Sequence, residues 1–195
     1  MAGTSPSGLL LPSREASISF SWLPPLTTAA FLALLCLAGW SDIRTRRIPN
    51  LLTLSGLVVG LFLRAVDGYM PLAHGLAGAG LALLIALPFF AGGALGGGDT
   101  KLLVAVGAFM GEGRLVGALL LIAVLGGVIA VVESIRRGVI LPVVMNSVDI
   151  LKRWATLGRA GAPRSLATPG AVSIPYGVAI ALGAAIWWFW GGTVL

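Results

Sequence analysis

The sequence predicts an all-α membrane protein, built as a bundle of six transmembrane helices with one cytoplasmic amphipathic helix. Of its 195 residues, 57% are hydrophobic and only 10% are charged, and the mean hydropathy is +0.99. A soluble domain of this length cannot bury that much apolar surface. The apolar residues also gather in long runs separated by short polar stretches, which is the pattern of membrane-crossing helices.

Residues 1–24 are the expected flexible N-terminal tail, and residues 25–195 the expected membrane domain. The tail is rich in Ser, Gly and Pro, and Pro12 interrupts its short apolar run Leu9–Leu11. No basic residue precedes that run, so it does not resemble a cleavable signal peptide.

Six apolar segments are the predicted transmembrane helices. A Pro-Pro pair suits the start of the first one, and three closely spaced tryptophans form an aromatic belt near the end of the last. The fourth is too short to cross about 30 Å at about 1.5 Å per residue. Either it continues backward through Asp99 and the glycines before it, or the bilayer is thinner there. The expected ranges are 25–40, 51–66, 72–90, 102–110, 115–132 and 174–190.

The distribution of Lys and Arg predicts the orientation of the bundle. The first, third and fifth connections carry ten of these residues, and the opposite side carries three. Because Lys and Arg concentrate in cytoplasmic loops, the odd connections are expected in the cytoplasm and both termini outside. The net charge of +6 is thus typical of a basic membrane protein and does not indicate nucleic-acid binding.

The fifth connection, residues 134–172, is a long basic loop on the expected cytoplasmic side. Within it, Val144, Val148, Leu151 and Ala155 share one helical face. This spacing predicts a short amphipathic helix lying on the membrane surface. Such a helix serves either as a platform that faces the substrate or as a simple surface anchor.

The cysteine and histidine content excludes several kinds of site. The chain has one cysteine, Cys36, and one histidine, His74. It therefore has neither an internal disulfide nor a CxxC motif, and an ordinary zinc site cannot be built. We expect no metal and no cofactor.

Two polar stretches lie at predicted cytoplasmic helix ends. Residues 42–50 read Asp-Ile-Arg-Thr-Arg-Arg-Ile-Pro-Asn, and residues 96–101 read Gly-Gly-Gly-Asp-Thr-Lys. A charge at the edge of a bilayer core is costly, which makes Asp42 and Asp99 candidate functional groups. Two neighbouring carboxylates share a proton, so one can activate water while the other protonates a peptide carbonyl. The sequence alone does not bring them together, because 56 residues lie between them.

These residues also have structural interpretations. Asp42 could pair with Arg46, four residues further along a helix. The Ile48–Asn50 segment could be a turn into the next helix. Lys101 could extend toward lipid phosphates, or it could hold negative charge near Asp99.

Together the two stretches resemble the motifs of the type IV prepilin peptidase family, whose members are membrane aspartic proteases with a GxGD motif. The first matches Asp, five residues, then Ile-Pro-Asn, and the second matches Gly-x-Gly-Asp-x-Lys-Leu. The segment Ile174-Pro175-Tyr176-Gly177 is similar to the start of the last helix in short members of the family. The resemblance covers roughly residues 26–190.

The resemblance implies that Asp42 and Asp99 are a water-activating catalytic pair. It implies a multi-pass protein of the plasma (inner) membrane, in contact with lipid, that cleaves the short basic leader of a prepilin at the cytoplasmic face. Pilus-assembly or secretion machinery is then an expected partner. Other motif residues are expected to support the site or bind substrate: Gly96, Gly98, Lys101, Pro49 and Asn50.

Two features favour the short, peptidase-only form associated with tight-adherence (Flp-type) pili. Long members also N-methylate the new pilin terminus and carry a cytoplasmic, cysteine-containing domain near their start. Here the first helix begins by about residue 25, and the chain has no CxxC motif. We therefore expect no N-methyltransferase activity.

Three other functions share parts of this pattern. An archaeal preflagellin peptidase has both motifs. Proteases of the presenilin and signal-peptide-peptidase type share GxGD, but they usually place the first Asp after a Tyr in mid-helix. A transporter or channel subunit also uses intramembrane acids, but relay acids lie mid-helix, whereas Asp42 and Asp99 lie at predicted helix ends.

Overall fold

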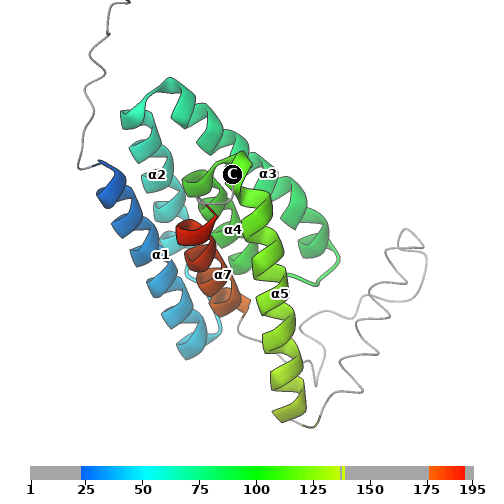
Figure 1. Cartoon of the computed structure of the whole chain (residues 1–195). Coiled ribbons are helices and arrows are strands. Elements are labelled where there is room, and N and C mark those ends of the chain that lie inside the picture. The colour runs from blue at the N-terminus through cyan, green and yellow to red at the C-terminus, as the bar shows by residue number, and fades with distance from the viewer. Residues whose placement is uncertain (1–22, 137, 139–175, 192–195) are drawn as a thin grey trace, which may run out of the picture.

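The computed structural model describes residues 23–136, 138 and 176–191. The regular structure of these residues is entirely helical, which confirms the all-α class for this part of the chain (Figure 1). The helices are α1 (Leu23–Thr45), α2 (Asn50–Asp67), α3 (Tyr69–Ala91), α4 (Gly97–Met110), α5 (Glu112–Arg136) and α7 (Tyr176–Trp190).

Four of these helices are long and apolar enough to cross a membrane, namely α1 from Pro25, α2, α3 and α5. The chain is therefore a multi-pass membrane protein. Helices α4 and α7 are shorter, with 14 and 15 residues, so a count of six spans stays a prediction. The expected amphipathic helix lies outside the described residues, as does most of the expected N-terminal tail.

Several helices extend further than their expected apolar runs, and the extensions of α1 and α4 include the candidate aspartates. Helix α1 was expected to end at Trp40 but continues to Thr45, which places Asp42 near its last turn. The apolar run of α4 begins at Leu102, but the helix begins at Gly97, as one of the two expected alternatives has it, so that Asp99 lies in its first turn. Apolar patterning reports burial in lipid or protein, whereas helical hydrogen bonding continues into the polar flanks. Of the two alternatives for the fourth segment, the helix therefore continues backward through Asp99 to Gly97.

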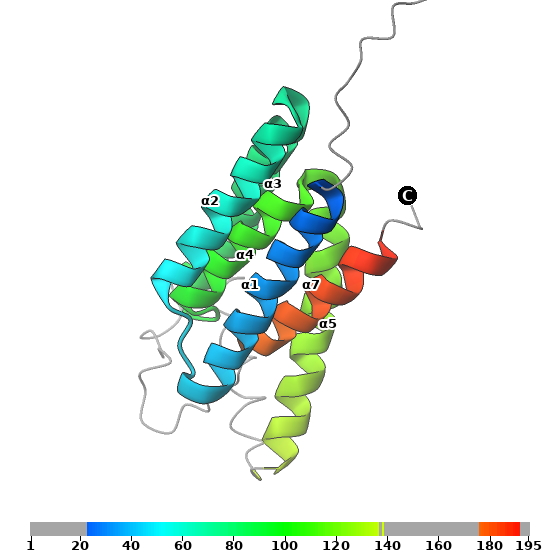
Figure 2. The ribbon, with the colours of Figure 1, turned by 90° about the vertical axis from the view of Figure 1, so that its left-hand side faces the viewer.

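Helix α4 lies inside the bundle, where it contacts each of the other five described helices. Figure 2 shows it running between α2, α3 and α1. Most of its residues from Thr100 onward are buried, as expected for a helix that is apolar on all sides. Its 14 residues span only about 21 Å, and its role is to form the core.

Close packing of α3 on α4 depends on two glycines. A β-carbon at Gly78 would collide with the carbonyl oxygen of Gly107, and a β-carbon at Gly107 would collide with that of Gly78. Small residues allow helix backbones to approach this closely in membrane bundles. The contact fixes α4 against its neighbour along the chain.

The end of α1, the start of α2, the start of α4 and the start of α7 gather in the lower half of the bundle (Figures 1 and 2). The four segments are brought there by the alternating up-and-down course of the chain. Both polar stretches identified in the sequence belong to this end.

Candidate active site

Asp42 is a buried carboxylate at the end of α1, with only 6% of its surface exposed. The backbone amides of Gly177 and Val178, in the first turn of α7, donate hydrogen bonds to it, and Arg46 attracts it electrostatically. Its atom Oδ2 is buried with no hydrogen-bond partner among the described residues. A buried oxygen without a hydrogen-bond partner is costly in free energy. Asp42 Oδ2 is therefore available to accept a hydrogen bond from a reacting group, such as the attacking water.

Asp99 lies in the first turn of α4, a helix that is not one of the four candidate spans. Burial, together with the negative charge of Asp42, raises the pKa of Asp99 to about 6, while a hydrogen bond from the Gly96 backbone opposes the rise. The two aspartates therefore lie close enough for the charge of one to act on the other, although 56 residues separate them in the sequence.

The loop after α1 turns sharply because Arg46 adopts a left-handed conformation, with φ of 51°. The amide of Arg46 donates to the carbonyl of Asp42 at 2.9 Å, which is the closure of an αL helix cap. The hydroxyl of Ser41 donates to the carbonyl of Arg47 at 2.8 Å, and that of Thr45 donates to the same carbonyl at 3.0 Å. These bonds fold the loop back onto α1 and direct the next residue, Ile48, inward.

Ile48 joins the two sequence motifs. It is 8% exposed and lies against Gly98, where an added β-carbon would be 3.2 Å from the Ile48 Cβ. On its other side its Cδ1 would be 2.9 Å from a β-carbon on Gly177. The Ile-Pro-Asn and GxGD stretches therefore form one packed unit, and Gly98 supplies the space for it.

Gly96 supplies a different space, beside the second aspartate. A β-carbon at this position would lie 2.8 Å from Asp99 Oδ2, so any side chain would push the carboxylate away from the start of α4. The hydroxyl of Thr100 donates to the Gly96 carbonyl at 3.0 Å. Gly96 and Gly98 are thus needed because neighbouring side chains pack directly against their backbone. Gly96 is not needed for an unusual backbone conformation, because its dihedral angles are those of ordinary extended chain.

The three remaining motif residues lie at the junction of α2 and α4. Pro49 is the N-cap residue of α2, and its carbonyl accepts hydrogen bonds from the amides of Leu52 and Thr53. The ammonium group of Lys101 donates to Asn50 Oδ1 at 2.8 Å. Residues two apart on a helix do not face each other, so the partner of Lys101 in this structure is Asn50 and not Asp99.

The first turn of α7 contributes two residues that sequence reasoning did not assign to the site. A β-carbon on Gly177 would lie 2.9 Å from Asp42 Oδ2. Tyr176 interacts electrostatically with Asp99, and its ring lies against Gly126 of α5. The sequence signal for these two residues was the similarity of Ile174-Pro175-Tyr176-Gly177 to the start of the last helix in short family members. Nothing in that similarity predicted that Tyr176 and Gly177 would lie beside the aspartates.

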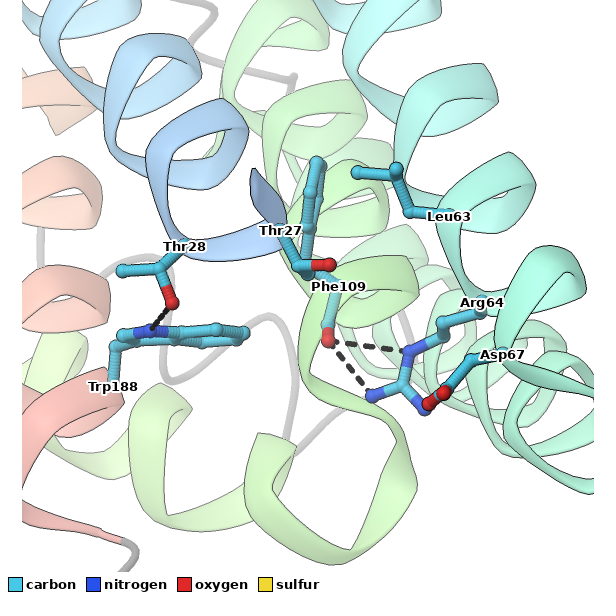
Figure 3. Close-up of a pocket in the computed structure, with 7 residues that line it drawn as sticks. All are labelled: Thr27, Thr28, Leu63, Arg64, Asp67, Phe109 and Trp188. Atoms are coloured by element: carbon cyan, nitrogen blue, oxygen red, sulfur yellow. Dashed lines mark hydrogen bonds between the residues drawn. The ribbon is translucent and has the colours of Figure 1, made fainter. Parts of the chain in front are cut away.

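A pocket of about 250 Å³ lies away from these residues, between the start of α1 and the end of α2 (Figure 3). Its arginine, Arg64, donates to the carbonyl of Phe109 through Nη2 at 2.7 Å and through Nε at 3.2 Å. A third bond runs to the carbonyl of Pro71. The polar groups there serve to tie helices together, and the pocket contains none of the predicted site residues.

A metal-binding cluster is not found in the part of the chain that the structure describes. No group of three or more His, Cys, Asp or Glu side chains lies close enough there to hold an ion. The one histidine, His74, pairs with Glu112. The polar groups that the described residues bring to the site are two carboxylates, two backbone amides and a phenol.

Comparison with known proteins gives one match. A family model described as the type IV leader peptidase family matches residues 29–131, which is more than half of the chain and includes both aspartates. No curated protein and no solved structure was found to match. The chain belongs to the type IV leader peptidase family.

Proposed function

We propose that this protein is a membrane aspartic endopeptidase that removes the leader peptide from prepilin-like proteins, with Asp42 and Asp99 as its catalytic pair. The observation that carries the proposal is the packing that joins the two motifs: Ile48 lies against Gly98, beside Asp99, and against Gly177, which contacts Asp42. The two aspartates come from the two motifs of the family and lie at the same end of the bundle.

The environments of the two carboxylates suggest different roles. Two backbone amides and the Arg46 charge offset part of the cost of burying an ionised Asp42, whereas burial and the charge of Asp42 raise the pKa of Asp99 to about 6. The shared proton of the pair therefore resides mainly on Asp99. Asp42 is then the general base, and Asp99 is the general acid.

In the first step Asp42 takes a proton from a water molecule, whose oxygen attacks the carbonyl carbon of the scissile peptide bond. Asp99 gives its proton to the carbonyl oxygen, and a neutral tetrahedral diol forms. In the second step Asp42 passes its proton to the leaving nitrogen while the C–N bond breaks. Asp99 recovers a proton from the diol, so the pair ends in its starting state without a covalent intermediate.

The substrate class follows from the family and from the position of the site. Both aspartates lie at helix ends, with Arg44, Arg46 and Arg47 at and just after the end of α1 and Lys101 near the start of α4. By the positive-inside rule this end of the bundle faces the cytoplasm, which places the site at the cytoplasmic face of the inner membrane. A prepilin presents its basic leader there, just before its apolar helix. This position also favours a peptidase over an ion relay, whose acids lie within the span.

We propose further that the protein is of the peptidase-only form associated with Flp-type pili. The chain has a single cysteine, Cys36, and no CxxC motif, so it lacks the cysteine cluster of the methylating members. The new amino terminus of the pilin should therefore leave this enzyme unmethylated.

The test is cleavage of a purified Flp-type prepilin by the purified protein in detergent. We expect a shorter pilin whose unmethylated amino terminus, read by mass spectrometry, maps to the junction of leader and apolar helix. The variant Asp67→Asn is a suitable control, because this acid lies at the opposite end of α2 and should leave cleavage unchanged. An intact prepilin after prolonged incubation with the folded protein would contradict the proposal.

A further inference from the structure

The hydrogen bond between Lys101 and Asn50 links two segments that are 51 residues apart in the sequence. Asn50 is the first residue of α2 and follows the loop that leaves Asp42. Lys101 follows Asp99 by two residues in α4. The bond therefore ties the segment that carries one aspartate to the segment that carries the other.

The other contact described between these segments is apolar. Ile48 packs on Gly98, and apolar packing of this kind is non-directional. A hydrogen bond has a defined length and angle. The Lys101–Asn50 bond thus adds a directional constraint between the start of α4 and the start of α2.

The chemistry of this bond also suits a site that depends on two carboxylates. The acceptor, Asn50 Oδ1, is a neutral amide oxygen, so the link adds no further negative charge beside the aspartate pair. A carboxylate at this position would also accept from Lys101, but its charge would favour protonation of both aspartates.

We propose that the Lys101–Asn50 hydrogen bond is a positioning link, which holds the start of α4 against the start of α2 so that Asp99 faces Asp42. Lys101 and Asn50 are thus positioning residues that act through the aspartates and do not contact the scissile bond. This inference rests on the proposed peptidase function.

The test compares the kinetics of prepilin cleavage by single and double variants. Lys101→Met keeps the aliphatic chain and removes the donors, and Asn50→Leu removes the acceptor at similar size. Each should lower kcat by roughly tenfold to a hundredfold, because small misplacements of catalytic groups have effects of this order. KM should change little. The double variant should be no slower than the slower single variant, since both remove the same interaction.

Two further variants separate positioning from general stability. Ser55→Ala removes an exposed hydroxyl that bonds within α2, to the carbonyl of Leu52, and it should leave kcat unchanged. Asn50→Asp keeps an acceptor for Lys101 and should retain most of kcat. Its added negative charge should also shift the pH profile of kcat toward higher pH. Retained kcat in Asn50→Asp beside reduced kcat in Asn50→Leu is a rescue that a merely structural role for the residue would not predict.

Three results would overturn the inference while leaving the peptidase function standing. The first is a Lys101→Met variant with the kcat of the wild type. The second is a Lys101→Met variant in which only KM rises, while Asn50→Leu has wild-type kcat and KM. The third is a loss of thermal stability in both variants while the kcat of the folded fraction stays unchanged. The second result would mean that Lys101 binds substrate. A wild-type protein that cleaves no prepilin would overturn the proposed function and this inference together.

Discussion

Gly177 and Asp42 are in such close contact that a β-carbon on the glycine would lie 2.9 Å from the carboxylate atom Oδ2. The same β-carbon would lie 3.0 Å from the Asp42 Cβ. The start of α7 therefore covers Asp42 from one side, and its amides bond to the same carboxylate. This relationship makes α7 part of the site, although its motif was assigned no role in the chemistry.

Replacing Gly177 with alanine should reduce peptidase activity strongly. The added methyl group must displace either the Asp42 carboxylate or the Ile48 side chain, and misplaced catalytic groups lose about a hundredfold in rate. The measurement is kcat for prepilin cleavage. The matched control is Gly127→Ala on α5, where an added β-carbon meets nothing within 4 Å. Equal activity of the two variants would show that the contact is not needed for catalysis.

Replacing Asp99 with asparagine should stabilise the protein at neutral pH. The pKa of Asp99 is raised from 3.8 to about 6, so the folded state binds this proton more tightly than the unfolded chain does. Below pH 3.8 both states are protonated and the group contributes nothing. Stability falls as the pH rises from 3.8 to about 6, and above that the full penalty is present. Each pKa unit is worth about 1.4 kcal/mol, so the penalty is at most about 3 kcal/mol.

Thermal unfolding in detergent provides the measurement for this effect. Asp99→Asn should unfold at a higher temperature than the wild type at pH 7.5, and the difference should vanish near pH 4. A difference that grew on acidification would contradict the assigned burial and charge repulsion.

Replacing Arg64 with methionine should destabilise the fold without changing the chemistry. Three hydrogen bonds from its guanidinium to the carbonyls of Phe109 and Pro71 would be lost. Bonds from charged groups are each worth about 1.5–3 kcal/mol, partly regained here through water. We expect a loss of about 1–3 kcal/mol in the free energy of unfolding, with kcat unchanged at temperatures where the variant is folded. A large fall in kcat of fully folded protein would mean that the two ends of the bundle are coupled.

Chelators should leave peptidase activity intact. The sequence has one His and one Cys, and the described residues contain no cluster of metal ligands. Two carboxylates suffice to activate water, so removal of divalent ions takes nothing from the reaction. The assay is prepilin cleavage after EDTA treatment and dialysis. Activity that was lost in EDTA and restored by zinc would disprove the two-carboxylate mechanism.

The described helices, and the position of both aspartates near helix ends, could be predicted from the sequence because these depend on local signals. Apolar runs report helices, and Asp42 and Asp99 stand in short motifs at helix ends. The continuation of α4 through Asp99 was one of two possibilities, and it became clear only once α4 was seen to be the buried core helix. A helix buried inside a protein need not match the thickness of a bilayer. The length of the apolar run alone therefore did not distinguish a backward continuation of the helix from a thinner bilayer.

The contacts of the motif residues could not be predicted from the sequence, because they depend on how helices that are distant in the sequence pack together. Periodicity shows which face of a helix is apolar, but not which helix covers it. The Lys101–Asn50 bond spans 51 positions, and Lys101 had two other reasonable interpretations. Gly177 reaches Asp42 from the far end of the chain, and only the packing of α7 on α1 brings them together.

Asp42 and Asp99 are proposed to act as one catalytic unit, and replacing each of them with asparagine is the decisive experiment. Asparagine keeps the shape of the side chain but cannot titrate, so the water loses its base or the carbonyl its acid. The measurement is leader cleavage of a co-expressed prepilin, with the abundance of each variant in the membrane checked by immunoblot. The account predicts that Asp42→Asn and Asp99→Asn each abolish cleavage at normal abundance, and that the double variant is no worse than either. Normal cleavage by either single variant would contradict it.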